Sequence, residues 1–166
     1  MIAELAERAG PGTDGKGDIT AIYSVLVAGS DMEEPVADMI RGILDGHIIL
    51  ARDIAERGRY PAIDILRSVS RSLPHAATDE ENTLIRECRR MFALHEEIAP
   101  MLRANLYEFG KDAEADKAIA LFSLLDKYAG TRNESGIEAA FTRLEDILKS
   151  EDGPEIQTMP VTPIEL

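Results

Sequence analysis

The spacing of apolar residues changes at Pro74, and this change divides the chain into two kinds of structure. Before Pro74, short apolar runs rich in β-branched residues alternate with runs of helix-forming residues. Strands that alternate with helices indicate an α/β layer, and we predict one over residues 1–74. The runs that read as strands are DITAIYSVLV (18–27), HIIL (47–50) and AIDIL (62–66). DITAIYSVLV is apolar on both faces, which predicts a central strand covered on both sides, and HIIL predicts a short buried strand.

Three helices are expected in this α/β portion. Residues 2–9 place apolar side chains on one side, and a second helix is predicted to begin at Pro35, because proline suits the first helical position. Residues 51–58 predict a third helix that ends at Gly58, since glycine is favoured just after a helix.

After Pro74, apolar residues recur at helical spacing. The segment TDEE (78–81) matches a capping box at the start of a long helix, which Pro100 is expected to kink or break. Residues 113–128 predict a second helix, ended by Gly130.

The segment SGIE (135–138) matches another capping box, followed by a further amphipathic run. We therefore expect an all-helical portion of three or four helices over residues 75–150. Residues 151–166 contain prolines and acids and predict a flexible acidic tail.

Composition limits the functions open to this chain. It has 166 residues and a formal net charge of −13, which makes it a poor candidate for nucleic-acid or anionic-membrane binding. Its single cysteine, Cys88, excludes an internal disulfide and lies in a helical pattern as a core residue. His47, His75 and His95 are widely spaced and predict no metal site. No run is long enough to span a bilayer, and residues 1–10 do not resemble a signal peptide, so we expect a cytoplasmic location.

The densest chemistry lies in GRYPAIDILRSVSR (58–71). Tyr60, next to the rigid Pro61, and Arg71 suit a site that stacks a base and contacts a phosphate, although the same residues also suit an ordinary strand-to-helix junction. The glycine-rich segment 12–17 is interpreted as a solvated loop, because the phosphate-loop pattern GxxxxGK[ST] is absent throughout the sequence.

Three segments of the chain resemble the flagellar protein-export ATPase, in the family shared with type III secretion ATPases and the ATP synthase catalytic subunit. They are residues 19–52, residues 55–74 (AERGRYPAIDILRSVSRSLP) and, more weakly, residues 106–121 (LYEFGKDAEADKAIAL). The third departs from the family pattern at Asn105-Leu106-Tyr107 and Lys111-Asp112-Ala113. The resemblance implies α/β plus α: the C-terminal strands and helices of a RecA-like P-loop NTPase domain over residues 1–74, followed by a helical C-terminal domain over residues 75–150.

The resemblance also implies roles for individual residues. Arg71 matches an arginine finger that reaches into the neighbouring subunit's nucleotide site in trans, and Tyr60, held by Pro61, matches a tyrosine that stacks on adenine. Tyr107 is expected either to line the same pocket or to pack within the helical portion. Apart from the resemblance, the position of Asp64 in the extended stretch after Tyr60 predicts that it orients Arg67 or Arg71 or caps the next turn. Two serines, Ser68 and Ser70, are expected to satisfy local backbone groups.

The implied function is part of an ATPase that drives flagellar type III protein export as a homohexamer, with ATP and Mg²⁺ bound by the full-length protein. The implied partners are a stalk, a regulator and chaperone–substrate proteins at the cytoplasmic face of the flagellar base, with no nucleic acid and only peripheral membrane association. The phosphate-binding loop lies upstream in the family, so we expect a fragment or truncated gene product that binds ATP weakly and is inactive alone. The alternatives are a non-catalytic helical adaptor and the same fragment of an injectisome or ATP synthase relative.

Overall fold

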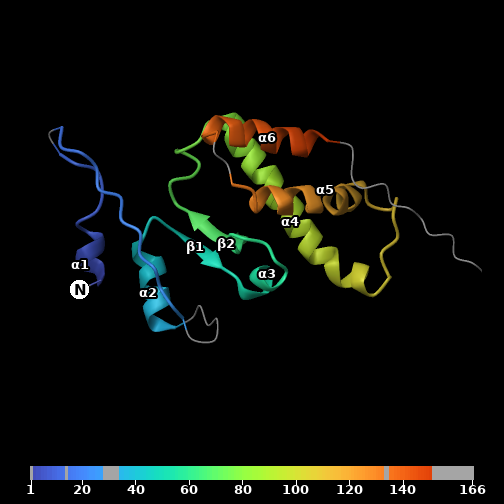
Figure 1. Cartoon of the computed structure of the whole chain (residues 1–166), viewed down its shortest axis with the longest axis horizontal. Coiled ribbons are helices and arrows are strands. Elements are labelled where there is room, and N and C mark those ends of the chain that lie inside the picture. Colours follow the sequence, from blue (N-terminus) through green and yellow to red (C-terminus); the bar gives the residue numbers. More distant parts are fainter. Residues whose placement is uncertain (1, 14, 28–33, 133–134, 151–166) are drawn as a thin grey trace, which may run out of the picture. The chain divides into compact units, whose positions relative to one another are not determined.

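The computed structural model describes residues 2–13, 15–27, 34–132 and 135–150 (Figure 1). The chain forms two compact units that divide between Ala76 and Ala77, and each unit is described by itself. The acidic tail expected over residues 151–166 lies outside the described residues.

The first unit contains a small antiparallel sheet and short helices. Its elements are α1 (Ile2–Ala6), α2 (Pro35–Ile43), β1 (Gly46–Leu50), α3 (Arg52–Glu56) and β2 (Ile63–Ser70). Pro35 occupies the first turn of α2, and Gly58, with φ +82°, ends the turn after α3, as the sequence predicts.

Strands β1 and β2 pair in two blocks that are out of step with each other. Gly46 and His47 pair with Ser70 and Val69, whereas Ile49 and Leu50 pair with Asp64 and Ile63. Between the two blocks β1 contributes only Ile48, while β2 contributes residues 65–68. This is a large β-bulge that offsets the end of β2 by three positions relative to a continuous ladder.

The strand predicted over residues 18–27 is wrong as a regular element. Among the described residues, only the bridge between Gly10 and Ile19 is formed there, and Ile22 and Leu26 are 91% and 96% exposed. The apolar pattern of residues 18–27 is typical of a strand that pairs with neighbouring strands and is covered on both faces. In the described part of this unit β1 and β2 pair with each other, and neither pairs with residues 18–27.

The strand expected at HIIL is present, but the prediction that it is buried is wrong. Ile49 is buried, whereas Ile48 and Leu50 are exposed. Adjacent side chains point to opposite faces of a strand, and only one face of this two-stranded sheet is covered at Ile49.

The second unit is a bundle of α4 (Asp79–Arg103), α5 (Ala113–Ala129) and α6 (Ile137–Lys149), each of which packs on the other two (Figure 1). Its core side chains come from all three helices: Cys88, Met91, Phe92, Ala118, Leu121, Leu125, Leu144 and Leu148 are buried. The rings of Phe92 and Phe122 meet edge to face at 5.9 Å.

The ends of the helices confirm the capping box predicted at Thr78, but they correct the break predicted at Pro100 and the capping box predicted at residues 135–138. Thr78 and Glu81 form the predicted capping box at the start of α4. Of the kink or break expected at Pro100, the break is wrong, because α4 continues to Arg103 and the backbone N–H of Ala104 still reaches the Pro100 carbonyl at 3.1 Å. A proline this close to the helix end removes a single N–H donor from the interior.

The capping box expected at residues 135–138 is also wrong. The residue that caps α6 is Gly136, with φ +89° and no side-chain cap. The helix therefore begins one residue too late for Ser135 to serve as its cap, and Glu138 stands one position short of where a capping box requires it.

Gly46 is the residue that the resumed β1–β2 pairing requires. A Cβ at this position would lie 2.6 Å from the Val69 carbonyl oxygen and 3.2 Å from the Ser70 Cα. Backbone atoms of a paired strand cannot move away without loss of the pairing, so the close approach depends on the missing side chain.

We expect Gly46→Ala to lower the free energy of unfolding by about 1–3 kcal/mol, because it overpacks the strand against its partner. Gly42→Ala is the matched control, since a Cβ at Gly42 in α2 meets nothing within 4 Å. That control should stabilise by about 0.5–1 kcal/mol through helix propensity. Denaturant unfolding followed by circular dichroism measures both, and equal stability of the two variants would contradict the close approach.

Candidate functional site

Tyr60 lies in the turn that leads into β2, and the residue is 66% exposed. The Tyr60–Pro61 peptide bond is cis. The Arg59 guanidinium donates hydrogen bonds to the carbonyls of Pro61 (3.3 Å) and Ile63 (2.8 Å). The backbone on both sides of Tyr60 is thereby tied together, while the aromatic face remains open to a planar ligand.

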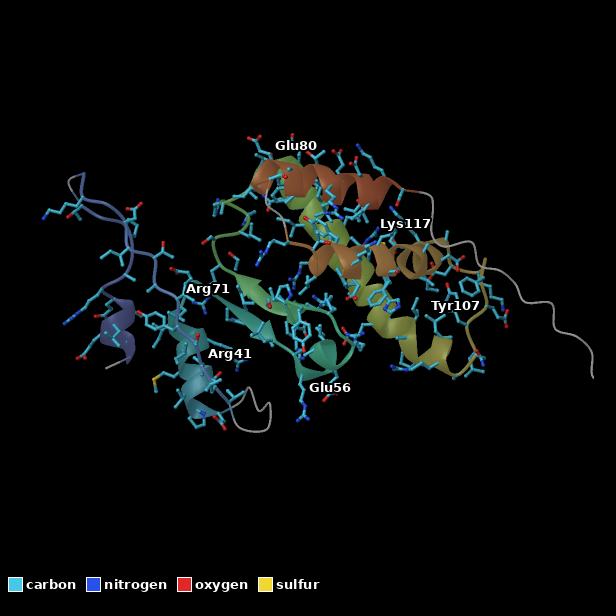
Figure 2. The ribbon with its side chains drawn as sticks, viewed as in Figure 1. Arg41, Glu56, Arg71, Glu80, Tyr107 and Lys117 are labelled. Carbon is cyan, nitrogen blue, oxygen red and sulfur yellow. The ribbon has the colours of Figure 1, made fainter. Side chains whose placement is uncertain are left out.

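Arg71 follows the other end of β2 and is also exposed. Its backbone N–H donates to the Asp45 carbonyl at 2.7 Å. Its guanidinium donates to the carbonyls of Arg41 (3.1 Å) and Gly42 (3.3 Å) in the last turn of α2 (Figure 2). These carbonyls have no partner within a helix, and the negative end of the helix dipole favours a cation there.

The two residues lie beyond opposite ends of the same strand. The two paired ends of β2, Ile63 and Ser70, lie opposite Leu50 and Gly46 at the two ends of β1. The length of β1 therefore separates the ends of β2 by about 13 Å, at roughly 3.3 Å per residue. Tyr60 lies three residues before β2, and Arg71 follows it directly. A pocket for a small ligand has a volume of about 300–1,000 Å³, which corresponds to a width of about 10 Å or less. Because the ends of β2 are farther apart than this, the spacing favours separate ligand contacts for Tyr60 and Arg71 over one shared pocket.

Between these ends, Asp64 and Ser68 hold the bulge with their side chains. Asp64 accepts from the backbone N–H of Arg67 at 2.9 Å and from Arg67 Nε at 2.6 Å. Ser68 Oγ donates to the Asp64 carbonyl (2.5 Å) and accepts from the backbone N–H of Ile49 (3.0 Å). Of the roles considered for Asp64, the structure supports two: Asp64 orients Arg67 through Nε, and it caps the turn through the Arg67 backbone N–H. Ser68 satisfies backbone groups as expected.

The electrostatics of this cluster favour the ionised carboxylate. Partial burial of Asp64 acts to raise its pKa, but the backbone N–H and guanidinium of Arg67 outweigh burial and leave the pKa below its usual value. His47 Nε2 lies 3.1 Å from the Arg67 carbonyl, and because a carbonyl only accepts, Nε2 carries the proton in this contact.

Tyr107, in the second unit, follows the end of α4 (Figure 2). Its hydroxyl donates to Asp116 on α5 at 2.8 Å, and the other oxygen of Asp116 accepts from the backbone N–H of Gly110 at 2.8 Å. Its ring meets Phe109 edge to face at 5.0 Å. Burial, together with the hydrogen bond and charge of Asp116, raises the pKa of Tyr107 to about 12. These contacts give Tyr107 a packing role in the loop between α4 and α5.

The remaining candidates have structural partners. Cys88 is buried, and desolvation raises the pKa of its thiol to about 11, which makes it an unreactive core residue. The His95 ring stacks on Phe122. Among the described residues, no group of three or more His, Cys, Asp or Glu side chains is arranged to hold a metal ion.

Sequence reasoning missed three contributors to this region: Gly46, Arg59 and the carbonyls at the end of α2. Arg59 precedes Tyr60 directly and is the one that adjacency in the sequence could have suggested. Gly46 and the α2 carbonyls act through the fold, because they meet Val69 and Arg71 only after β1 and β2 have paired.

Each of the two units matches a known protein family. The nucleotide-binding domain of the ATP synthase alpha/beta family matches residues 1–70, and the T3SS EscN ATPase C-terminal domain matches residues 77–145. The chain thus combines part of a nucleotide-binding domain with the helical domain that accompanies it in secretion ATPases. It belongs to the family of ATPases that contains the flagellum-specific ATP synthases and the type III secretion ATPases.

Relatives are similar over most of the chain. The flagellum-specific ATP synthase of Helicobacter pylori is 40% identical over 90% of this chain and 35% of its own length. The SPI-2 type 3 secretion system ATPase of Salmonella typhimurium is 48% identical over 71% of this chain and 27% of its own length. The chain spans about a third of the length of the curated relatives it matches.

Solved structures are similar as well. The assembled ATPase EscN of the enteropathogenic E. coli type III secretion system superposes with a TM-score of 0.81 at 37% identity, over 89% of this chain and 36% of that one. EscN in complex with its central stalk EscO gives a TM-score of 0.77 at 37% identity, over 89% of this chain and 35% of that one. The predicted fold class, the end of a RecA-like domain followed by helices, is confirmed. None of the helices in the described residues is long and apolar enough to cross a membrane.

We expect Tyr107→Phe to lower the free energy of unfolding by about 1 kcal/mol, because it removes the hydrogen bond to Asp116. The folded pKa of about 12 exceeds the ordinary value of 10.0, so this contribution is present below pH 10. It is lost as the pH rises towards 12, and the gap to the wild type should close there. Denaturant unfolding at several pH values measures the gap. Tyr60→Phe, on an exposed ring, should show no gap at any pH, and a constant gap for Tyr107→Phe would contradict the assignment.

Proposed function

We propose that this chain supplies part of the ATP-hydrolysing ATPase of flagellar type III protein export, in which Tyr60 and Arg71 serve two different nucleotide sites. The observation that carries the proposal is the position of the two residues beyond opposite ends of β2, in a unit that matches a nucleotide-binding domain. One subunit can then present an aromatic face to its own nucleotide and an arginine to that of its neighbour.

Tyr60 is the proposed adenine platform. Its exposed ring projects from a turn that Arg59 and Pro61 hold in place, and an aromatic face stacks on any base without great selectivity. We include Tyr107 in the proposal as a second ring near adenine, contributed by the helical unit. Because Asp116 binds its hydroxyl, the ring is the part of Tyr107 left to contact a base.

Arg71 is the proposed arginine finger. Phosphoryl transfer spreads negative charge over the equatorial oxygens, and a guanidinium offers fixed, paired donors to such oxygens. In the structure Nη2 and Nη1 of Arg71 donate hydrogen bonds to two neutral backbone carbonyls, at 3.1 and 3.3 Å. Contact with a phosphate in trans requires an exchange of these bonds to neutral acceptors for bidentate bonds to an anion, which are shorter and stronger.

The proposed setting follows from the relatives. EscN has been solved as an assembled ATPase and in complex with a central stalk. We propose a homohexamer that binds ATP and Mg²⁺, with a stalk, a regulator and chaperone–substrate proteins as partners at the cytoplasmic face of the flagellar base. Residues 1–74 belong to the RecA-like domain in this proposal and residues 75–150 to the helical domain. The sequence has no phosphate-loop motif, so the chain alone is expected to bind ATP weakly and not to hydrolyse it.

The second candidate is a non-catalytic helical adaptor of the export apparatus, and the observation that favours it is the compact unit formed by α4, α5 and α6. The two candidates differ in whether Arg71 affects ATP turnover. Tight, magnesium-dependent binding of ATP to the 166-residue chain would contradict both.

We expect Arg71→Ala in the full-length ATPase to lower kcat by about 10³–10⁵-fold with little change in the KM for ATP, because a finger acts mainly in the transition state. Arg71→Lys should recover little, since an ammonium lacks the paired donors. Arg52→Ala is the matched control, because Arg52 is an exposed arginine of the same unit that pairs with Glu56 at 2.8 Å. Its kcat should equal that of the wild type.

Co-assembly separates action in trans from action in cis. Arg71→Ala subunits, mixed with subunits whose own phosphate-binding loop is inactivated, should regain part of the lost turnover, because the second kind supplies the finger to the first. Unchanged kcat in Arg71→Ala would reject the finger, and failure of co-assembly to restore turnover would reject its action in trans.

We expect Tyr60→Ala to weaken ATP binding by about 1–3 kcal/mol, roughly 5–150-fold, and Tyr60→Phe to preserve it, because the ring and not the hydroxyl stacks. The loss should be similar for GTP, since every base has a stacking face. Tyr107→Ala should weaken binding in the same direction, and Tyr107→Phe should not. Nucleotide titration of the full-length ATPase measures these affinities, and equal affinity of Tyr60→Ala and the wild type would remove Tyr60 from the site.

A further inference from the structure

The bulge in β2 determines where Arg71 emerges from the sheet. Continued without interruption, the pairing of Ile49 with Asp64 would place Arg67 opposite Gly46, where Ser70 lies in the structure. The rest of β2 would then shift by three positions along β1, which corresponds to about 10 Å. An odd shift also turns each side chain to the other face of the sheet. Arg71 would therefore lie away from Asp45 and the end of α2.

The bulge is held by side chains in place of a backbone ladder. The Asp64 carboxylate accepts a hydrogen bond from the Arg67 backbone N–H at 2.9 Å. Ser68 Oγ accepts one from the Ile49 backbone N–H at 3.0 Å and donates one to the Asp64 carbonyl at 2.5 Å. The Asp64 side chain is only 16% exposed. These bonds close the loop of residues 65–68, so that pairing can resume at Val69 and Ser70.

We propose that Asp64 and Ser68 are positioning residues for Arg71: they fix the bulge that delivers the arginine to the edge of the subunit in the correct register. This inference rests on the proposed role of Arg71. Neither residue contacts the nucleotide in this account, and both act through the backbone that leads to Arg71. The Arg67 side chain is more than half exposed, and its backbone N–H closes the turn, so we expect loss of the Arg67 guanidinium to disturb the bulge less than loss of Asp64 or Ser68.

Amide hydrogen exchange in the 166-residue chain, followed by NMR, reports the position of Arg71 whether or not it acts as a finger. Two backbone bonds bracket the bulge: Arg71 N–H to Asp45 O at 2.7 Å, and Ala51 N–H to Ala62 O at 2.9 Å. In Asp64→Ala and in Ser68→Ala, the Arg71 amide should lose protection while the Ala51 amide keeps it. Retention at both amides would overturn the proposal, and so would loss at both, since the residues would then hold the sheet as a whole.

Activity of the full-length ATPase provides the second readout. Asp64→Ala and Ser68→Ala should each lower kcat by about 10²-fold with the KM for ATP unchanged, as expected for a misplaced transition-state group. Asp64→Asn, which keeps an oxygen to accept the Arg67 N–H, should restore most of the rate. Arg52→Ala, which removes an exposed arginine of the same unit outside the bulge, is the matched control and should keep the wild-type rate.

Combination with Arg71→Ala separates the two proposals. If Asp64 and Ser68 act through Arg71, Asp64→Ala should lower kcat no further in a chain that already carries Arg71→Ala. A fully multiplicative loss would overturn the positioning role while it leaves the finger in place. An Arg71→Ala variant with normal kcat would reject the finger alone, and the exchange experiment would still decide whether Asp64 and Ser68 position residue 71.

Discussion

The pairing of β1 with β2, interrupted and then resumed around residues 65–68, is the constraint on which the first unit depends. It brings Arg71 to the C-terminal turn of α2 and leaves Tyr60 beyond the opposite end of the strand. Side chains make this possible, because the bulge removes ladder bonds that Asp64 and Ser68 then replace. Ile49 is a buried residue, and a buried N–H without a partner costs about 1–3 kcal/mol, so the bond that its N–H makes to Ser68 Oγ supports the pairing around the bulge.

The two units differ in how completely they cover their apolar residues. The helical unit buries Met91, Leu121 and Leu125 almost fully between its three helices. The first unit leaves Ile22 and Leu26 exposed, although the run in which they lie has the apolar pattern of a covered strand. Such a run is stable as a strand only when neighbouring strands supply hydrogen bonds and both faces are covered. The sequence of this unit is therefore suited to a larger sheet than the two described strands provide.

Local rules predicted much of the fold, and the failures lie where tertiary pairing decides. The capping box at Thr78 and the end of α5 at Gly130 depend on residues within one turn of each other, and both are found as predicted. The bulge could not be predicted, because its side chains bond to Ile49 on another strand, far away in the sequence. At α6, the backbone of Gly136 took the capping position from Ser135. For the site, spacing left Tyr60 and Arg71 open between a functional and an ordinary role, and resemblance to a family pointed to their chemistry.

The resting contacts of Arg71 fit the proposed role on physical grounds. A finger that serves a neighbouring subunit needs a fixed backbone and a side chain that is easily released. The backbone is fixed by the 2.7 Å bond to Asp45, whereas the guanidinium is exposed and bonded to neutral carbonyls at 3.1 and 3.3 Å. An ion pair with a carboxylate would hold the guanidinium more strongly, and a buried one would be costly to break. The end of α2 therefore keeps Arg71 ordered at low cost and leaves it free to move to a phosphate, which offers both charge and paired acceptors.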